Sequence, residues 1–367
     1  MTRMYPSSGK SWNPPGRKPR SSRDISWSWR NPSRIRGEET MKHVLVIPGD
    51  GIGSEVITPT VEILSELVSS IDFEYASAGK ALFEAEGFSI SEGTIEAARK
   101  ADAVLFGATE TVYSSAYRSP VLDLRQKLDL FANVRIIREL RPNRKKVDFV
   151  IFRENTEGMY TRDEEQLPGE VITHRRISES ACRRISEFSL SYCEEHGIGE
   201  IVCVHKANVL RLSDGLFVRI FREIASGYAE IESSDMLVDA AAMNIAMAPE
   251  RFRAITTLNL YGDILSDLGA GLVGGLGFIP SANIGQMNAM FEPAHGSAPD
   301  IAGKGMANPF AAILSSAMML DHIGFRKESE KLAEAVRSAV PGVEVDENGR
   351  CSTISAVDTV KRILFRS

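Results

Sequence analysis

The chain has 367 residues, of which 43% are hydrophobic and 25% are charged, so it is long enough for two domains with their own cores. No stretch approaches the roughly 18 consecutive apolar residues of a membrane-spanning helix, which argues against a protein that crosses the membrane by such helices. The net charge of −6 argues against a nucleic-acid-binding surface. Four cysteines without CxxC or metal-ligand spacing favour a reducing compartment, and we expect a cytoplasmic protein.

Residues 1–40 differ from the rest of the chain in composition. They contain nine Lys and Arg against three acids, together with all three Trp. Removing their net charge of +6 from the total of −6 leaves −12 for residues 41–367. The segment has no apolar h-region, and its prolines would break the amphipathic helix of a transit peptide. We interpret it as a disordered tail, or as sequence ahead of a start at Met41.

The first predicted element after this tail is a strand at 43–47, which runs into a glycine turn at 48–53. A helical pattern follows through Leu67, and the order strand, glycine turn, helix is typical of the start of an α/β domain. The turn is not a Rossmann fingerprint, because Ser54 stands where the third glycine belongs. A literal G-x-G-x-x-G at 269–274 begins nine residues after the nearest predicted strand and fails the same test.

Strands and helices alternate along the body of the chain. Strands are predicted at 103–106, 148–152, 200–204 and 254–260, helices at 179–195 and 215–226, and a helix followed by a strand within 121–138. This alternation predicts an α/β architecture with functional side chains where the strands end.

Two carboxylates four residues apart follow the last of these strands. Gly262 is expected to mark a strand-to-helix turn, after which Asp263 and Asp267 share one face of a helix. Two carboxylates about 6 Å apart at an effective dielectric of about 20 repel each other by roughly 3 kcal/mol. A divalent cation between them would remove that cost, because hard cations prefer carboxylate oxygens. An exposed helix face with two solvated carboxylates is the alternative that spacing alone leaves open.

Three arginines lie near predicted strand ends, namely Arg125, Arg135 and Arg153. Arg suits bidentate recognition of carboxylates, although each one taken singly also fits an ordinary surface charge. Tyr160 follows the third arginine, and a tyrosine of ordinary pKa near 10 needs a cationic neighbour to transfer protons near neutral pH. Lys206, directly after a strand, offers such a cation, or else it is an exposed turn lysine.

Together these residues resemble a known family. From Met41 onward the chain is similar to the decarboxylating β-hydroxyacid dehydrogenases, which include isocitrate, homoisocitrate and 3-isopropylmalate dehydrogenases. The resemblance covers nearly all 327 residues from that position. Its markers are PGDGIG at 48–53, LR at 124–125, NVR at 133–135, RENTE at 153–157, HKANV at 205–209, GDILSD at 262–267 and HGSAPDIAG at 295–303.

The resemblance implies a two-domain α/β/α fold of the isocitrate/isopropylmalate dehydrogenase type around one large mixed sheet, which is not a Rossmann fold. Domain 1 would bind the cofactor and comprise residues 41–140 and 285–367. Domain 2, residues 141–284, would hold substrate and metal and would form an obligate homodimer with shared active sites. No nucleic acid or membrane partner is implied.

The resemblance also implies roles for single residues. Mg²⁺ or Mn²⁺ would be bound by Asp263 and Asp267 of one subunit and Asp239 of the partner subunit, and would act as a Lewis acid on the substrate. The three arginines would hold the carboxylate that is lost as CO₂. The partner subunit's Lys206 would take the hydroxyl proton as hydride moves to the nicotinamide, and Tyr160 would protonate the enol that decarboxylation leaves.

The cofactor implied is NAD, with its adenosine wrapped by residues 295–303. Asp300 and Ile301 stand where NADP-preferring members typically carry Lys and Tyr. A carboxylate accepts hydrogen bonds from a ribose 2′-OH and repels a 2′-phosphate. The cofactor-binding residues implied are Asn208, His295, Gly296, Ser297, Ala298, Asp300, Ile301 and Asn308.

The residues just before Arg125 face the variable group of the substrate in this family. Ser119 matches the isocitrate enzymes, whereas Val121 and Leu122 give an apolar lining closer to the isopropylmalate enzymes. This mixture, with Arg118 adjacent, resembles the homoisocitrate-type enzymes of archaea. The implied reaction is the NAD-dependent oxidative decarboxylation of a 3-substituted malate of homoisocitrate type, with 3-isopropylmalate and isocitrate as the alternatives.

Three departures from the family pattern remove no chemical group. Ile136 stands in place of the usual Pro, Arg162 in place of a Gly, and residues 343–349 differ from the common segment at the edge of the cofactor.

The rival from another class is a non-catalytic regulatory subunit. Such subunits tend to lose parts of the Arg, Tyr, Lys and Asp set, whereas this chain keeps all eight. A nucleic-acid-binding role would rest on the tail alone.

Overall fold

The structure is a computed structural model that describes residues 41–365 except 113, 115 and 142–145. The segment interpreted as a tail, residues 1–40, lies outside the described residues. The strands are β1 Lys42–Gly49, β2 Ile71–Tyr75, β3 Ala103–Ala108, β4 Ala132–Arg138, β5 Asp148–Glu154, β6 Glu164–Leu167, β7 Glu170–Thr173, β8 Glu200–His205, β9 Glu232–Leu237, β10 Ala254–Thr257, β11 Pro280–Ile284 and β12 Ala289–Pro293. The helices are α1 Gly53–Leu67, α2 Lys80–Glu86, α3 Glu92–Lys100, α4 Pro120–Lys127, α5 Glu179–Glu195, α6 Ser213–Ala225, α7 Val238–Met247, α8 Asn259–Val273, α9 Phe310–His322, α10 Arg326–Ala339 and α11 Thr353–Leu364, with a 3₁₀ turn η2 at Met159–Thr161.

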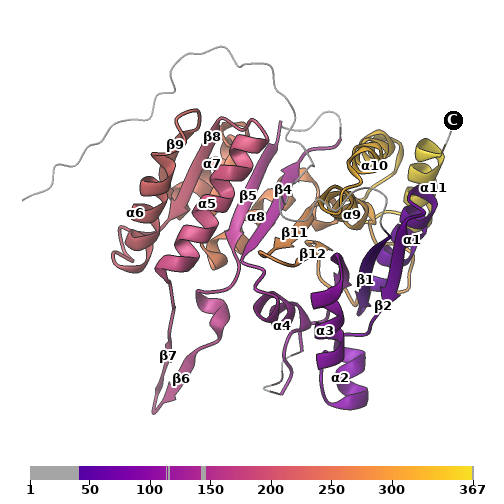
Figure 1. Ribbon diagram of the computed structural model, residues 1–367, viewed down its shortest axis with the longest axis horizontal. Coiled ribbons are helices and arrows are strands. Elements are labelled where there is room, and N and C mark those ends of the chain that lie inside the picture. Colours follow the sequence, from indigo (N-terminus) through magenta and orange to yellow (C-terminus); the bar gives the residue numbers. More distant parts are fainter. Residues whose placement is uncertain (1–40, 113, 115, 142–145, 366–367) are drawn as a thin grey trace, which may run out of the picture.

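Ten strands form one mixed sheet in the order β2-β1-β3-β12-β11-β4-β5-β10-β8-β9. The sheet is mixed because β11 runs antiparallel to β12 and β4, and β4 runs antiparallel to β5. Helices α1, α9, α10 and α11 gather beside one half, and α5, α6, α7 and α8 lie along the other (Figure 1). Strands such as β3 and β5 are buried on both faces, as their continuous apolar runs predict. The α/β/α fold around a large mixed sheet is therefore confirmed.

The two ends of the chain and its middle supply different halves of this sheet. Strands β2, β1, β3 and β12 come from the two ends, whereas β5, β10, β8 and β9 come from the middle. Between the halves, β11 from the middle lies next to β4 from the N-terminal part. The two predicted domains thus interleave at the centre of the sheet, and their boundaries at 140 and 284 stay a prediction.

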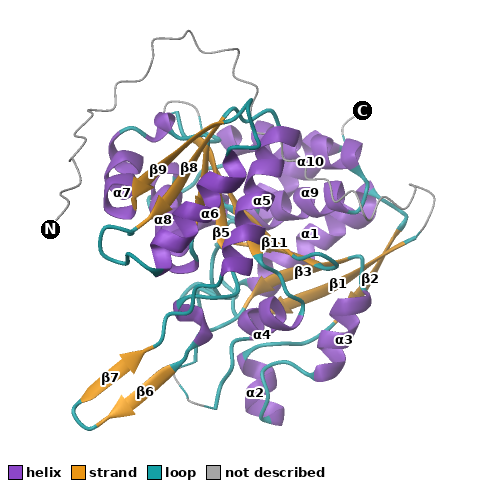
Figure 2. Ribbon diagram, turned by 60° about the vertical axis from the view of Figure 1, so that its left-hand side comes forward, coloured by secondary structure: helices purple, strands orange, loops and turns teal. Residues whose placement is uncertain are grey.

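A hairpin of β6 and β7 extends away from the body of the molecule (Figures 1 and 2). Nearly all of its residues are exposed, including the apolar Val171 and Ile172. This hairpin was not predicted from the sequence, because each of its strands has only four residues and no buried face.

The interior contains all four cysteines of the chain, and each of them is a buried free thiol. Burial raises the pKa of the Cys182 and Cys351 thiols to about 12, so they stay protonated and unreactive near neutral pH. Within residues 41–365, as far as they are described, no helix combines the length and apolar character needed to cross a membrane.

Gly262 does not mark a turn, as the sequence suggested, but lies inside α8. A Cβ on this residue would lie 2.6 Å from Cγ of Arg153, so the absence of a side chain lets α8 pack directly against β5. The glycines of the pattern at 269–274 belong to the body and C-terminal end of the same helix. They follow no strand directly, which agrees with their exclusion as a dinucleotide fingerprint.

Replacing Gly262 with Ala should therefore destabilise the protein by roughly 1–3 kcal/mol, because the added methyl group overpacks this contact. Urea unfolding followed by circular dichroism measures the effect. Gly271→Ala is the matched control on the same helix, since its Cβ would meet no atom within 4 Å. Alanine favours helices over glycine by about 1 kcal/mol, so this control should be stabilised. Equal free energies of unfolding for the two variants would contradict the close approach.

Candidate functional site

Three buried arginines come together from α4, β4 and β5. Arg125, Arg135 and Arg153 expose only 7%, 5% and 1% of their surface, so none of them is an ordinary surface charge. In the antiparallel pair of β4 and β5, Arg153 stands opposite Asn133, which makes Arg135 its diagonal neighbour on the same face. Burial is the main cause that lowers the pKa of Arg153 to about 10, and repulsion from the charge of Arg135 lowers it further.

The two carboxylates of α8 face these guanidinium groups. Asp263 Oδ1 accepts a hydrogen bond from Arg153 and lies 3.5 Å from Nη2 of Arg135. Asp267 Oδ1 lies 3.5 Å from Nη1 of Arg135. Tyr160 on η2 donates to the other carboxylate oxygen of Asp263, and the guanidinium carbon of Arg153 lies 4.9 Å from the centre of its ring. Both aspartates lie on one helix, as the sequence predicts, and the structure adds that they pair with the arginines.

The protonation of these groups follows from their surroundings. Burial opposes ionisation of Asp263, but the attraction of Arg153 and Arg135 outweighs it and holds the pKa of Asp263 below its ordinary value. Burial raises the pKa of Asp267, and the charge of Asp263 adds to this rise. Burial also raises the pKa of Tyr160, so its phenol is protonated near neutral pH. The side chains of the two aspartates remain 37% and 58% exposed, which leaves them accessible to a cation.

Lys206 and Asp239 form a second, separate cluster. Lys206 follows β8 and its ammonium group makes an ion pair with Asp239, in the first turn of α7. The fully buried Asp214 accepts from the backbone N–H of Lys206 at 2.7 Å and holds this turn in place. Within the described chain, no hydrogen bond or ion pair joins this cluster to Tyr160 or to the aspartates of α8. Among all the residues that the structure describes, no group of three His, Cys, Asp or Glu side chains could bind a metal.

The segment predicted to wrap the cofactor packs against the first glycine turn. The backbone N–H of Ile52 donates to the carbonyl oxygen of Ser297 at 2.9 Å, and a Cβ on Gly51 would lie 2.1 Å from that oxygen. Glu55, in the first turn of α1, accepts from the backbone N–H of Gly303 at 3.2 Å. Two markers separated by more than two hundred residues therefore form one surface.

Within this segment, His295 has a buried Nε2 without a hydrogen-bond partner among the described residues. Burial lowers the pKa of His295, so its imidazole is neutral near pH 7. The carboxylate of Asp300 accepts from Nη2 of Arg350 at 2.8 Å. Asn308 is buried, and its amide Nδ2 donates to the carbonyl oxygen of Gly349 at 3.2 Å. Arg350 was not predicted from the sequence, because it follows a segment that departs from the family pattern.

The remaining predicted cofactor residues differ in exposure. Ile301 and Ser297 are buried, whereas Gly296 and Asn208 are exposed. Ala298 adopts a left-handed backbone with a φ of 39°. Asn208 belongs to the turn that carries the predicted catalytic lysine, so it is grouped with the second cluster.

The predicted substrate-specificity residues lie at the start of α4. Ser119 is the N-cap residue of this helix, but its hydroxyl makes no capping hydrogen bond. Val121 and Leu122 are half-buried. Arg118 is exposed and donates from Nε and Nη2 to Oδ1 of Asp123, at 3.0 and 2.8 Å. These residues stand close together on one short segment, and that they line the substrate site stays a prediction.

A buried carboxylate beside Arg125 was also not predicted from the sequence. Glu292 on β12 accepts from Nη2 of Arg125 at 2.9 Å and from Nδ2 of Asn283 at 2.7 Å. The only signal in the sequence was that Glu292 is a single acidic residue within an otherwise apolar strand. Prediction from hydrophobic periodicity does not detect such a residue.

Unsatisfied donors test whether the predicted ligands fit this site. Nε of Arg125 and Nη2 of Arg153 are buried without a partner in the described chain, although buried polar groups are normally paired. Carboxylate oxygens are suitable acceptors for such donors. The oxygen donors of Asp263 and Asp267 suit Mg²⁺ or Mn²⁺, and the free Nε2 of His295 suits a cofactor with hydrogen-bonding groups.

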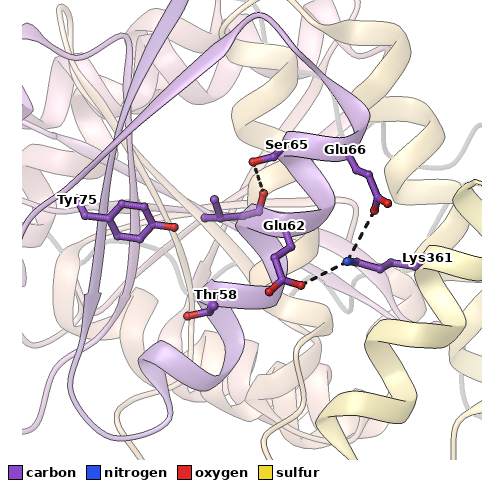
Figure 3. Close-up of a pocket in the computed structure, with 7 residues that line it drawn as sticks. Thr58, Glu62, Ser65, Glu66, Tyr75 and Lys361 are labelled. Carbon is purple, nitrogen blue, oxygen red and sulfur yellow. Dashed lines mark hydrogen bonds and ion pairs between the residues drawn. The ribbon is translucent and has the colours of Figure 1, made fainter.

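A surface pocket of about 610 Å³ lies elsewhere, between α1, β2 and α11 (Figure 3). Nζ of Lys361 lies 3.3 Å from Glu62 and 3.7 Å from Glu66, so its charge is already balanced. The residues that line the pocket include none of the predicted site residues. This pocket therefore offers no alternative catalytic set.

Comparison with known proteins agrees with the geometry. The family model described as isocitrate/isopropylmalate dehydrogenase matches residues 43–347. The chain is 43% identical over 329 residues to a 3-isopropylmalate dehydrogenase of Methanothermobacter thermautotrophicus, covering 88% of this chain and 98% of the relative. It is 44% identical over 313 residues to a homoisocitrate dehydrogenase of Methanocaldococcus jannaschii, covering 81% and 90%.

A crystal structure of isocitrate dehydrogenase from Methylococcus capsulatus superimposes with a TM-score of 0.85 at 36% identity. The match covers 89% of this chain and 100% of that one. The family and these relatives are oxidoreductases that act on a hydroxyl group with decarboxylation. The chain therefore belongs to the isocitrate/isopropylmalate dehydrogenase family.

Proposed function

We propose that the protein catalyses the NAD-dependent, metal-dependent oxidative decarboxylation of a 3-substituted malate, with a homoisocitrate-type acid as its preferred substrate. One observation carries this proposal. Three buried arginines, two of them with unsatisfied donors, face two carboxylates and a protonated tyrosine. Such a cluster suits a substrate that is itself a polycarboxylate, because its carboxylates would satisfy the free guanidinium donors. Membership of the family supports the reaction class.

Asp263 and Asp267, completed by Asp239 of the partner subunit, are the proposed ligands of Mg²⁺ or Mn²⁺. When bound, the ion would supply Lewis acidity toward the hydroxyl and carboxylate of the substrate. Tyr160, held protonated by its surroundings, is the proposed donor of a proton to the enol. Lys206 is the proposed acceptor of the hydroxyl proton in the site of the partner subunit.

Asp267→Asn should weaken binding of Mn²⁺ by roughly 10–100-fold or more, because it removes an anionic oxygen from the donor set. Calorimetric titration of the folded variant with Mn²⁺ measures the affinity, and circular dichroism checks the fold. Asp358→Asn, an exposed aspartate on α11, is the matched control and should leave Mn²⁺ affinity unchanged. Wild-type affinity in the Asp267 variant would rule out this metal site.

We further propose that the protein is a homodimer. Helices α7 and α8 expose Met243, Met247 and Ile264 by 56%, 70% and 57%, and the β6–β7 hairpin exposes two more apolar residues. An exposed apolar surface of this kind is typical of a protein–protein contact. A dimer through these helices would also explain why one chain holds its lysine apart from its own arginine cluster, since each lysine would serve the other subunit.

Mixing two inactive variants tests this sharing. Tyr160→Phe and Lys206→Met should each be nearly inactive alone. In a mixed dimer, one site combines an intact tyrosine with an intact lysine, so refolding the two together should restore up to about a quarter of wild-type activity. Turnover and light scattering are measured on the mixture, with each variant refolded alone as the control. No recovery in verified mixed dimers would show that tyrosine and lysine act within one chain.

NAD is the proposed cofactor because the family resemblance assigns Asp300 to the ribose of the adenosine, where its exposed carboxylate would repel a 2′-phosphate. Similar relatives carry the names of isopropylmalate, homoisocitrate and isocitrate enzymes, so similarity alone does not select the substrate. The choice of homoisocitrate is therefore based on Ser119 and Arg118. A terminal carboxylate that reaches Ser119 or Arg118 would leave the methylenes of a longer acid against Val121.

The enzyme is assayed with isocitrate, homoisocitrate and 3-isopropylmalate, each with NAD and with NADP. The highest kcat/KM is expected for homoisocitrate with NAD. The apolar wall discriminates a methylene by only about 10–200-fold, so some activity with the other acids is expected. Ser119→Ala and Arg118→Ala should raise the KM for homoisocitrate and leave that for 3-isopropylmalate unchanged. Fastest turnover of 3-isopropylmalate, with both substitutions harmless, would favour the isopropylmalate alternative. No turnover of any acid would favour a regulatory subunit.

A further inference from the structure

We propose that Glu292 is a positioning residue for substrate recognition, which holds the guanidinium group of Arg125 in place for the substrate carboxylate. This inference rests on the function proposed above. Glu292 does not need to contact the substrate, because it acts through the arginine.

The first support is the burial of this ion pair. The side chains of Arg125 and Glu292 are 8% and 9% exposed, and Nη2 lies 2.9 Å from Oε1. A buried charge without a partner is strongly destabilising, and a charge-assisted hydrogen bond fixes the geometry of the guanidinium plane. Because Nη2 is held on Glu292 while Nε has no partner in the described chain, one donor remains free toward a ligand.

The second support is a network of amides behind the ion pair. Oε1 of Glu292 also accepts from Nδ2 of Asn283, whose Oδ1 accepts from Nδ2 of Asn133 at 2.9 Å. Oδ1 of Asn133 in turn accepts from Nε of Arg135 at 2.9 Å. These residues lie on the neighbouring strands β12, β11 and β4. The network thus sets the position of Arg125 relative to Arg135 through rigid sheet rather than through loops.

The third support is the distribution of charge. Asp263 lies against both Arg153 and Arg135, and the second aspartate of α8 pairs with Arg135 as well. Within the described residues, Glu292 is the carboxylate that pairs with Arg125. If a cation draws the two aspartates toward itself, Glu292 remains the counter-ion of the arginine cluster.

Two roles for this carboxylate predict opposite effects on the affinity for substrate. If Glu292 merely adds negative charge, its removal should lower the KM for an anionic substrate, because repulsion is lost. If it positions Arg125, its removal should raise KM, because the guanidinium group would no longer be held where it binds the substrate carboxylate. We expect the second result.

The test compares Glu292→Gln with wild type, using the best of the three malates. The expected result is a rise in KM of roughly 10–100-fold for the malate, with little change in the KM for NAD. The melting temperature should fall, because Arg125 loses its buried counter-ion. Glu154→Gln is the matched control, since Glu154 is also buried in the sheet but accepts from Thr156 and Glu157 rather than from an arginine. This control should leave the KM for the malate unchanged.

A double-mutant cycle separates positioning from general damage to the fold. In an Arg125→Met background, Glu292→Gln should add no further rise in KM, because the residue through which it acts is gone. Calorimetric binding of the malate in the presence of Mn²⁺ gives the same comparison without turnover. An unchanged or lowered KM for Glu292→Gln, or a full additional effect in the Arg125→Met background, would overturn this inference alone. A wild-type protein that neither binds nor oxidises any of the three malates would overturn the proposed function and this inference with it.

Discussion

The site depends on how α8 packs against β5. Gly262 has no side chain, so the helix reaches the stem of Arg153 directly, and Asp263 one residue later meets its guanidinium group. A buried arginine that faced only other arginines would be costly, and its lowered pKa reflects that strain on the charged form. The carboxylates of α8 offset this cost. One backbone contact therefore brings together both charge types of the proposed active site.

This balance of charge also bears on the proposed chemistry. In the structure, the aspartates of α8 pair with Arg135 and Arg153, while single donors on Arg125 and Arg153 remain unsatisfied. If Asp263 and Asp267 hold a divalent cation as proposed, the carboxylates of a bound polycarboxylate would be the groups that neutralise Arg135 and Arg153. Binding of the metal and of the substrate would thus exchange one set of ion pairs for another, with few charges left unpaired at any stage.

The two clusters on one chain have a common structural origin. Tyr261, just ahead of Asp263 on α8, donates its hydroxyl to Asp214, and the same carboxylate accepts from the backbone of Lys206. Asp214 also pairs with Arg175, which follows the β6–β7 hairpin. The lysine turn, the helix of the aspartates and the base of the hairpin are therefore held by one fully buried carboxylate. In the proposed dimer, elements that belong to two different active sites would be anchored at the same point.

The sequence by itself determined the α/β alternation and the helical spacing of Asp263 and Asp267, because hydrophobic period and residue spacing are local properties. The helix predicted at 179–195 is α5, and the strand predicted at 148–152 lies within β5. Motif order then identified the family. The sequence did not predict the β6–β7 hairpin, which has no buried face, and it assigned Gly262 to a turn. Only the tertiary structure decided what surrounds Arg125, since Glu292 and the Asn283 network meet it from strands more than a hundred residues away. Local pattern carries no information about such contacts, because they are created when β12 and β11 enter the sheet.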